Sequence, residues 1–142
     1  RIAGYARALK EFGLTADESL ILDNHLTLKA GSEMAQQAIQ MNPRPTALFA
    51  TNNFIAIGAI RAIQKADLRI PEDIALVGFD DLPEHMVIEP FLTVASQPAY
   101  EMGKQAMELL LNRLSDTDDT SYKENILPTS LIVRQSSGRP IC

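Results

Sequence analysis

Two pairs of polar side chains have the clearest potential for chemistry in this sequence. Asn52-Asn53 and Asp80-Asp81 each follow a short apolar run. A carboxylate accepts hydrogen bonds from neighbouring hydroxyl groups, and an asparagine amide both donates and accepts. Arg1 can add a rigid, planar fork of donors. Together these side chains form a set that is suited to recognising a polyol or a sugar.

The same residues allow other interpretations, which the pattern alone leaves open. The asparagine pair can cap a helix that follows it, and Asp81 can end a turn. Asp80 and Asp81 could instead hold Mg²⁺ and accept a phosphoryl group, or form a metal site with Glu84 and His85. However, no lysine at a recognisable spacing completes a phosphate site, and there is no glycine-rich phosphate loop or nucleophile elbow. We therefore expect no enzyme activity, no metal and no cofactor.

Helix-like and strand-like segments alternate along the chain and would position these side chains. Apolar residues at three- and four-residue steps predict helices over residues 1–12, 31–41, 54–65 and 100–114. Short apolar runs predict strands at 19–22, 47–50, 74–79 and 92–96, and a closing strand or pair at 126–127 and 131–133.

This order of segments predicts an α/β fold in which helices flank a parallel sheet. The run 47–50 is short and continuously apolar, which predicts a strand buried on both faces. Ligands of open parallel sheets bind beyond the carboxyl ends of the strands. Both polar pairs are expected at that edge.

The composition is that of a single globular domain. The 142 residues are 46% hydrophobic and 22% charged, with 13 Lys and Arg against 18 Asp and Glu and a formal net charge of −5. The acidic balance argues against direct binding of a nucleic acid backbone by this chain. One cysteine, Cys142, excludes an internal disulfide, and no apolar run approaches the roughly 18 residues of a membrane span. Because the chain opens with Arg1 inside an amphipathic pattern, we interpret it as a fragment.

Several runs of the sequence, taken together, resemble the LacI/GalR family of bacterial transcriptional regulators. They are residues 1–9, 45–62, 68–81, 90–98, 101–106 and 127–137, and they occur in the family's order. In that family a helix-turn-helix binds operator DNA, and a region built like the periplasmic sugar-binding proteins binds a small effector between two α/β subdomains. The resemblance implies that residues 1–142 are the C-terminal part of such an effector-binding region, with a type I periplasmic-binding-protein-like fold.

The resemblance also implies how the chain divides between the two subdomains. Residues 1–96 and about 126–136 would belong to the C-terminal subdomain, and residues 97–121 to the N-terminal one. The helix over 100–114 would then lack the sheet on which it packs. The rest of the N-terminal subdomain and the DNA-binding headpiece are expected to lie outside this chain, which would carry only part of the effector site.

Residue-by-residue transfer from the family gives candidate effector contacts. They are Arg1, Asn52, Asp80, Gln97 and Leu26, the last at a position where many members place an aromatic wall of the pocket. The family usually has an aspartate directly after the asparagine, at the position of Asn53 in this chain. This difference removes a carboxylate and would change either the helix cap or the polarity towards the ligand.

The resemblance further implies a cytoplasmic repressor that forms homodimers and changes its affinity for operator DNA when a sugar or sugar derivative binds. The predicted dimer interface consists of the apolar residues Phe54, Ile57, Ile60 and Ile88. An apolar patch outside the core is typical of a partner surface. The alternative is a periplasmic sugar-binding protein of a transporter, which would share the fold and the class of ligand. No association with a membrane is expected.

Overall fold

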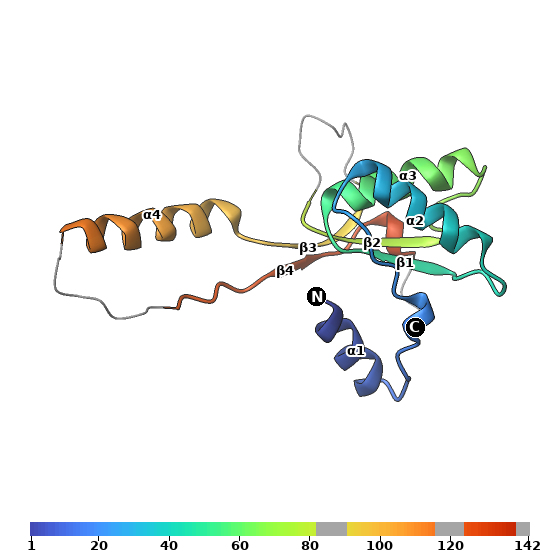
Figure 1. Ribbon diagram of the computed structural model, residues 1–142, viewed down its shortest axis with the longest axis horizontal. Helices are drawn as coiled ribbons and strands as arrows, with labels where there is room; N and C mark the ends of the chain where they lie inside the picture. Colours follow the sequence, from blue (N-terminus) through green and yellow to red (C-terminus); the bar gives the residue numbers. More distant parts are fainter. Residues whose placement is uncertain (82–90, 116–123, 139–142) are drawn as a thin grey trace.

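The centre of the structure is a four-stranded sheet with the strand order β1-β2-β3-β4. The computed structural model describes residues 1–81, 91–115 and 124–138. Three strands run parallel and the fourth is antiparallel to its neighbour (Figure 1): β1 (Ala47–Ala50), β2 (Ala75–Phe79), β3 (Thr93–Ser96) and β4 (Ser130–Ile132). In the register of the ladder, Leu48 pairs with Leu76, and Gly78 pairs with Val94. The predicted α/β class with a parallel-dominated sheet is confirmed.

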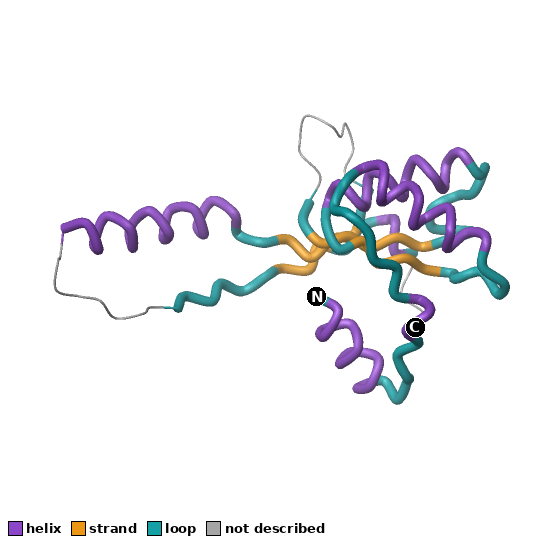
Figure 2. The backbone as a smooth tube through the Cα atoms, in the orientation of Figure 1, coloured by secondary structure: helices purple, strands orange, loops and turns teal. Residues whose placement is uncertain are grey.

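Two of the helices cover one face of this sheet. The helical segments are α1 (Ile2–Glu11), η1 (Glu18–Leu20), α2 (Leu28–Gln40), α3 (Asn53–Lys65), α4 (Ala99–Ser115) and η3 (Gln135–Ser137). α3 packs on β1 and β2, and α2 packs on α3, so that the two helices form one layer (Figure 2). η3 contacts β2 and β3. Among the described residues, no helix is both long and apolar enough to span a lipid bilayer.

The core lies between α3 and the centre of the sheet. α3 buries Ile55, Ala59 and Ala62. These residues belong to one buried cluster with Leu76 of β2 and Val94 of β3. Residues three and four positions apart share one face of a helix, which gives a continuous buried stripe. Burial of each large aliphatic side chain contributes roughly 1.5–3 kcal/mol, so this cluster holds the helix layer on the sheet.

Two glycines allow α2 and α3 to approach each other closely. A Cβ on Gly58 would lie 2.3 Å from the Leu28 carbonyl oxygen and 2.7 Å from the Ser32 backbone nitrogen. A Cβ on Gly31 would lie 2.6 Å from the Ile55 carbonyl oxygen. All these neighbours are backbone atoms, which cannot move without displacing a helix. The missing side chains at these two positions therefore set the distance between the helices.

The end of α1 and the start of α2 are set by local backbone and side-chain geometry. α2 begins at Leu28 rather than at the predicted residue 31, because the Thr27 hydroxyl accepts a hydrogen bond from the Ala30 N–H at 3.1 Å. α1 stops before Gly13, as predicted, where a φ of 73° gives the left-handed backbone that closes a helix end.

The strand predicted at residues 19–22 is wrong. The structure has the short helix η1 there, followed by an extended residue. The Asp17 carboxylate accepts hydrogen bonds from the N–H and the hydroxyl of Ser19, at 2.9 and 2.7 Å. Such local bonding by an aspartate side chain competes with strand formation. At the other end of the chain, the closing strand forms only at β4, and residues 126–127 lie outside it.

The prediction that residues 47–50 are buried on both faces is also wrong. β1 is the edge of the sheet, and among the described residues it pairs only with β2. Leu48 and Ala50 of β1 face the core under α3, whereas Phe49 lies on the opposite face of the strand and is 42% exposed. A short apolar run predicts a strand, but it does not distinguish a central strand from an edge strand.

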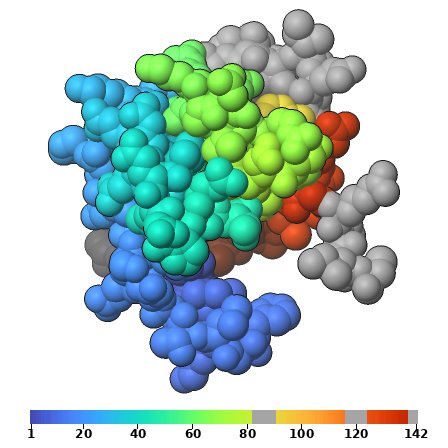
Figure 3. Space-filling view, turned by 90° about the vertical axis from the view of Figure 1, so that its right-hand side faces the viewer, coloured from blue at the N-terminus to red at the C-terminus, as the bar shows by residue number. Residues whose placement is uncertain are grey.

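α1 and α4 contain no buried residue among those described. α4 points away from the sheet as an arm beyond β3 and β4 (Figure 1), and α1 lies in the blue protrusion at the lower end of the surface in Figure 3. The large apolar side chains that α4 exposes, apart from Tyr100, are Met102, Met107, Leu110, Leu111 and Leu114. An exposed apolar stripe of this size is unusual for a folded domain and marks a contact surface.

The close contact of α2 with α3 generates a test of the packing. Gly58→Ala is expected to destabilise the chain by roughly 1–3 kcal/mol, because the added methyl group forces the two helices apart. Gly4→Ala is the matched control, since Gly4 is also helical but a Cβ there meets nothing within 4 Å. The control should stabilise by up to about 1 kcal/mol through helix propensity. Urea denaturation followed by circular dichroism measures both, and equal midpoints for the two variants would contradict the close packing.

Candidate functional site

Asp80 directly follows β2 and has an unusual backbone conformation. Its φ of 68° lies in the left-handed region, which residues other than glycine rarely adopt. Its N–H donates a hydrogen bond to the Ala95 carbonyl of β3 at 2.9 Å. The end of the β2–β3 ladder therefore fixes this turn, and the carboxylate lies at the edge where the parallel strands end.

Arg1 and Gln97 converge on the Asp80 carboxylate. The Gln97 amide nitrogen donates to Asp80 Oδ1 at 2.6 Å, and Arg1 Nη2 lies 3.8 Å from Asp80 Oδ2. Arg1 is also held by a hydrogen bond from Nη1 to the Thr51 carbonyl and by the Phe79 ring, whose centroid lies 4.0 Å from Cζ. The side chains of Arg1 and Asp80 are 37% and 31% exposed. We call these three residues the Arg1–Asp80–Gln97 cluster.

The arrangement of this cluster suits hydroxyl recognition. An accessible carboxylate can accept hydrogen bonds from hydroxyl groups, while the neighbouring guanidinium and amide donate to hydroxyl oxygens. The ion pair between Arg1 and Asp80 is long and partly solvated, and such pairs contribute little stability. A ligand can therefore replace this ion pair with its own hydrogen bonds at small energetic cost.

Asn52 caps α3 at the same edge of the sheet. Its Oδ1 accepts a hydrogen bond from the Ile55 N–H at 2.8 Å, so the capping interpretation of the asparagine pair is confirmed. Asn53 is the first residue of α3 and is not the cap. The cap uses only the side-chain oxygen of Asn52, which leaves the amide nitrogen as the group that can donate to a ligand.

Leu26 and the predicted dimer residues lie outside this cluster, and their roles stay predictions. Leu26 is in the loop before α2, with its side chain 63% exposed. On α3, Phe54 is exposed and Ile57 is half-buried, whereas Ile60 packs partly against the core. Ile88 lies outside the described residues.

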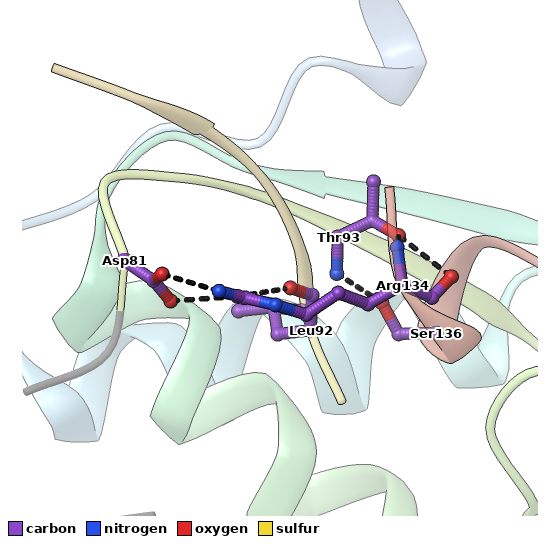
Figure 4. Close-up of polar contacts among 5 residues, drawn as sticks. All are labelled: Asp81, Leu92, Thr93, Arg134 and Ser136. Carbon is purple, nitrogen blue, oxygen red and sulfur yellow. Dashed lines mark hydrogen bonds and ion pairs between the residues drawn. The ribbon is translucent and has the colours of Figure 1, made fainter. Parts of the chain in front are cut away.

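Asp81, the residue after Asp80, forms an ion pair that the sequence did not predict. Nη1 and Nη2 of Arg134 donate to the two carboxylate oxygens of Asp81 at 2.9 and 2.7 Å (Figure 4). Nη1 also donates to the Leu92 carbonyl at 2.8 Å. The hydrogen bonds to the Asp81 carboxylate raise the pKa of Arg134 above its ordinary value. The two residues are 53 positions apart, so no local spacing could have signalled the pair.

This ion pair weighs against the phosphoacceptor and metal interpretations of the two aspartates. Both oxygens of Asp81 accept hydrogen bonds from a cationic side chain, which opposes a bound divalent ion. Within the part of the chain that the structure describes, no group of three or more His, Cys, Asp or Glu side chains could hold a metal ion. Glu84 and His85 of the metal hypothesis lie outside that part.

Comparison with known proteins relates these features to characterised relatives. Residues 1–137 match the family described as "Periplasmic binding protein-like domain". The repressor PurR of Vibrio atlanticus is 41% identical over 118 residues, which cover 83% of this chain and 35% of that protein. The ribose operon repressor of Haemophilus influenzae is 34% identical over 136 residues, which cover 96% of this chain and 41% of that protein. The chain thus spans well under half the length of these relatives.

A LacI family transcriptional regulator from Enterococcus faecium, solved with bound ribose, has the same fold. The TM-score is 0.85 at 27% sequence identity, and the match covers 96% of this chain and 50% of that chain. Fold and relatives define the effector-binding region of a transcriptional regulator. The chain belongs to the periplasmic binding protein-like domain family, and it is similar to a repressor and to a LacI family regulator within it. Its relatives are repressors rather than enzymes, as expected, and they do not favour the transporter alternative.

Asn52 provides a test that separates capping from other roles. Asn52→Ala is expected to lower the free energy of unfolding by about 1 kcal/mol, because the Ile55 N–H loses its acceptor. Asn52→Asp keeps an acceptor oxygen and should stay within about 0.5 kcal/mol of the original chain. Urea denaturation measures both variants. Identical unfolding midpoints for alanine and aspartate would show that the cap contributes nothing.

Proposed function

We propose that this chain supplies one side of the effector site of a LacI-type repressor. The observation that carries the proposal is the Arg1–Asp80–Gln97 cluster, which joins the end of β2 to residues that precede α1 and follow β3. Ligands of open α/β sheets bind at this edge. Support also comes from a relative named as a ribose operon repressor and from a similar regulator that was solved with ribose.

The chemistry of the cluster favours a sugar or a sugar derivative as the effector. Asp80 would accept hydrogen bonds from two neighbouring hydroxyls, and Arg1 would donate to hydroxyl oxygens. Gln97 orients the Asp80 carboxylate through its 2.6 Å hydrogen bond. The Asn52 amide nitrogen would add a hydrogen-bond donor at the start of α3, and Leu26 would form an apolar wall against the sugar ring.

The effector would act on DNA through a longer protein, which we call the intact repressor. In it, a second α/β subdomain completes the effector site and a separate headpiece contacts operator DNA in the cytoplasm. The net charge of −5 on this chain supports a separate DNA-binding part, because nucleic acid backbones are bound by clustered Lys and Arg. The effector binds one arrangement of the two subdomains better than the other, and the resulting population shift changes operator affinity.

In the intact repressor, residues 97–121 would belong to the second subdomain, and α4 would pack there. Residues 1–96 and about 126–136 would form the subdomain that contains the sheet. Support comes from α4 itself, which contains no buried residue and exposes a stripe of methionine and leucine side chains. A helix with an apolar stripe is stable when another layer of the protein covers that stripe.

The intact repressor would form homodimers through α3. Phe54 is 51% exposed in the first turn of this helix, and Ile57 is half-buried one turn later. These apolar side chains lie beside the face that packs on the sheet. Together with Ile60 and Ile88, they would be covered by the same residues of a second copy, as symmetric dimers require.

The effector role of Asp80 can be tested by operator binding. In the intact repressor, one member of a panel of sugars and sugar phosphates should change operator affinity, and Asp80→Ala should abolish this response without weakening DNA binding. Loss of hydrogen bonds to a charged acceptor, at about 1.5–3 kcal/mol, predicts a roughly ten- to hundredfold higher Kd for the sugar. Fluorescence anisotropy of labelled operator DNA measures the response.

Asp67→Ala is the matched control for this experiment. Asp67 is the other non-glycine residue with a positive φ in the described chain, at 55°, but it is exposed and lies after α3, outside the cluster. Its substitution should leave the sugar response unchanged. A response that survives Asp80→Ala would contradict the proposed role of Asp80. Sugar binding by an intact protein that does not bind DNA would instead support a transport receptor.

The proposed packing of α4 has its own test. Leu110→Ala should destabilise the intact repressor by roughly 2–5 kcal/mol, because it removes a side chain that would be buried against the second subdomain. In residues 1–142 alone, where Leu110 is exposed, the change should be below about 0.5 kcal/mol. Glu108→Ala, at an exposed position of the same helix, is the control in both proteins. Small effects of Leu110→Ala in both urea titrations would argue against the packing.

A further inference from the structure

Asp80 has a left-handed backbone conformation. The direction of its carboxylate therefore depends on how the backbone is held on both sides of this residue. On the N-terminal side, β2 and the hydrogen bond from the Asp80 N–H to the Ala95 carbonyl hold the chain. A residue other than glycine stays in this conformation only when its surroundings fix it. The C-terminal side therefore needs an anchor as well, and the next residue is Asp81.

Arg134 provides that anchor. Its two Nη atoms bind both carboxylate oxygens of Asp81 at 2.9 and 2.7 Å, and Nη1 also binds the Leu92 carbonyl at 2.8 Å. The Arg134 side chain is only 18% exposed. Paired, charge-assisted hydrogen bonds of this kind restrict both the distance and the orientation of the carboxylate. Figure 4 shows the Arg134 side chain extended across the chain at Leu92 towards Asp81.

The backbone of Arg134 is itself fixed to the sheet. Its N–H donates to the Thr93 hydroxyl oxygen at 2.8 Å. Two residues further on, the Ser136 hydroxyl donates to the Leu76 carbonyl at 2.6 Å and accepts from the Thr93 N–H at 2.8 Å. Thr93 and Ser136 are 3% and 0% exposed. A buried network thus connects the centre of the sheet, through Arg134, to the turn that contains Asp80.

We propose that Arg134 is a positioning residue of the effector site, whose ion pair with Asp81 holds the neighbouring Asp80 carboxylate in its binding orientation. Arg134 acts through Asp81 and does not contact the ligand. This inference rests on the proposed effector role of Asp80. It assigns the segment after β4 a part in ligand affinity, in addition to its part in stability.

The first experiment measures the position of Asp80 directly, without a ligand. NMR spectra of the intact repressor, labelled selectively at aspartate with ¹³C and ¹⁵N, report the backbone conformation of Asp80 through its Cα and Cβ chemical shifts. Arg134→Met should move these shifts away from left-handed values. Arg134→Lys, which keeps the charge but not the planar fork, should move them less. If Arg134→Met does not fold, the lysine variant alone carries the comparison.

The second experiment measures ligand affinity, with D-ribose as the probe and calorimetry as the readout. Arg134→Met should raise the Kd at least about fivefold, as expected for directly coupled residues. Arg69→Met is a matched control, because it removes a similar two-pronged pair with Asp73, at 2.9 and 3.3 Å, on the surface. Ile63→Val is a control for lost stability, since it leaves a cavity at a fully buried position of α3 outside this network. Both controls should keep the Kd within about twofold.

The two readouts separate failure of this inference from failure of the proposed function. Unchanged Asp80 shifts in Arg134→Met overturn the positioning role, whatever binds. A Kd that changes equally in Arg134→Met and Ile63→Val overturns it too, because the effect would then follow stability alone. If the unsubstituted repressor does not bind ribose, the choice of sugar is wrong, and the NMR shifts still decide whether Arg134 positions Asp80.

Discussion

The site depends on the parallel pairing of β2 with β1 on one side and with β3 on the other. Parallel strands end at the same edge, so the residues that follow β1, β2 and β3 meet there although they are distant in sequence. The close contact between α2 and α3 adds to this order, because it fixes where α3 begins and hence where Asn52 lies. Packing on one face of the sheet thus determines the positions of polar groups at its end.

Much of the fold could be predicted because it follows from local periodicity. The spacing of apolar residues predicted α3, and the run that ends at Phe79 predicted β2. Predictions failed where a local polar contact, or the covering of a sheet face, decides the outcome. The residues after Asp17 form a short helix stabilised by that side chain, and Phe49 is exposed because it lies on the face of β1 opposite to α3. Neither fact is contained in the pattern of apolar residues.

The candidate site was predictable only in part, and for different reasons at each residue. The rule that ligands bind beyond the ends of parallel strands drew attention to Asp80 and Asn52. The donor chemistry of its side chain suggested Arg1, and family resemblance added Gln97. The structure brings Arg1 and Gln97 to the carboxylate of Asp80. The partner of Asp81 was missed, because a salt bridge between distant segments leaves no periodic pattern in the sequence. Such a pair depends on the complete topology of the fold.

The pairing of β3 with β4 has a mechanical consequence. The arm that carries α4 is attached to the sheet by two antiparallel strands, which are joined at Ser96 and Ser130 (Figure 1). A single connecting chain can rotate about its bonds, whereas two connections that leave the sheet side by side oppose such rotation. Any body that α4 carries is therefore restrained from twisting about its attachment to the sheet. Gln97 lies one residue beyond Ser96, so its hydrogen bond to Asp80 lies at the base of the arm.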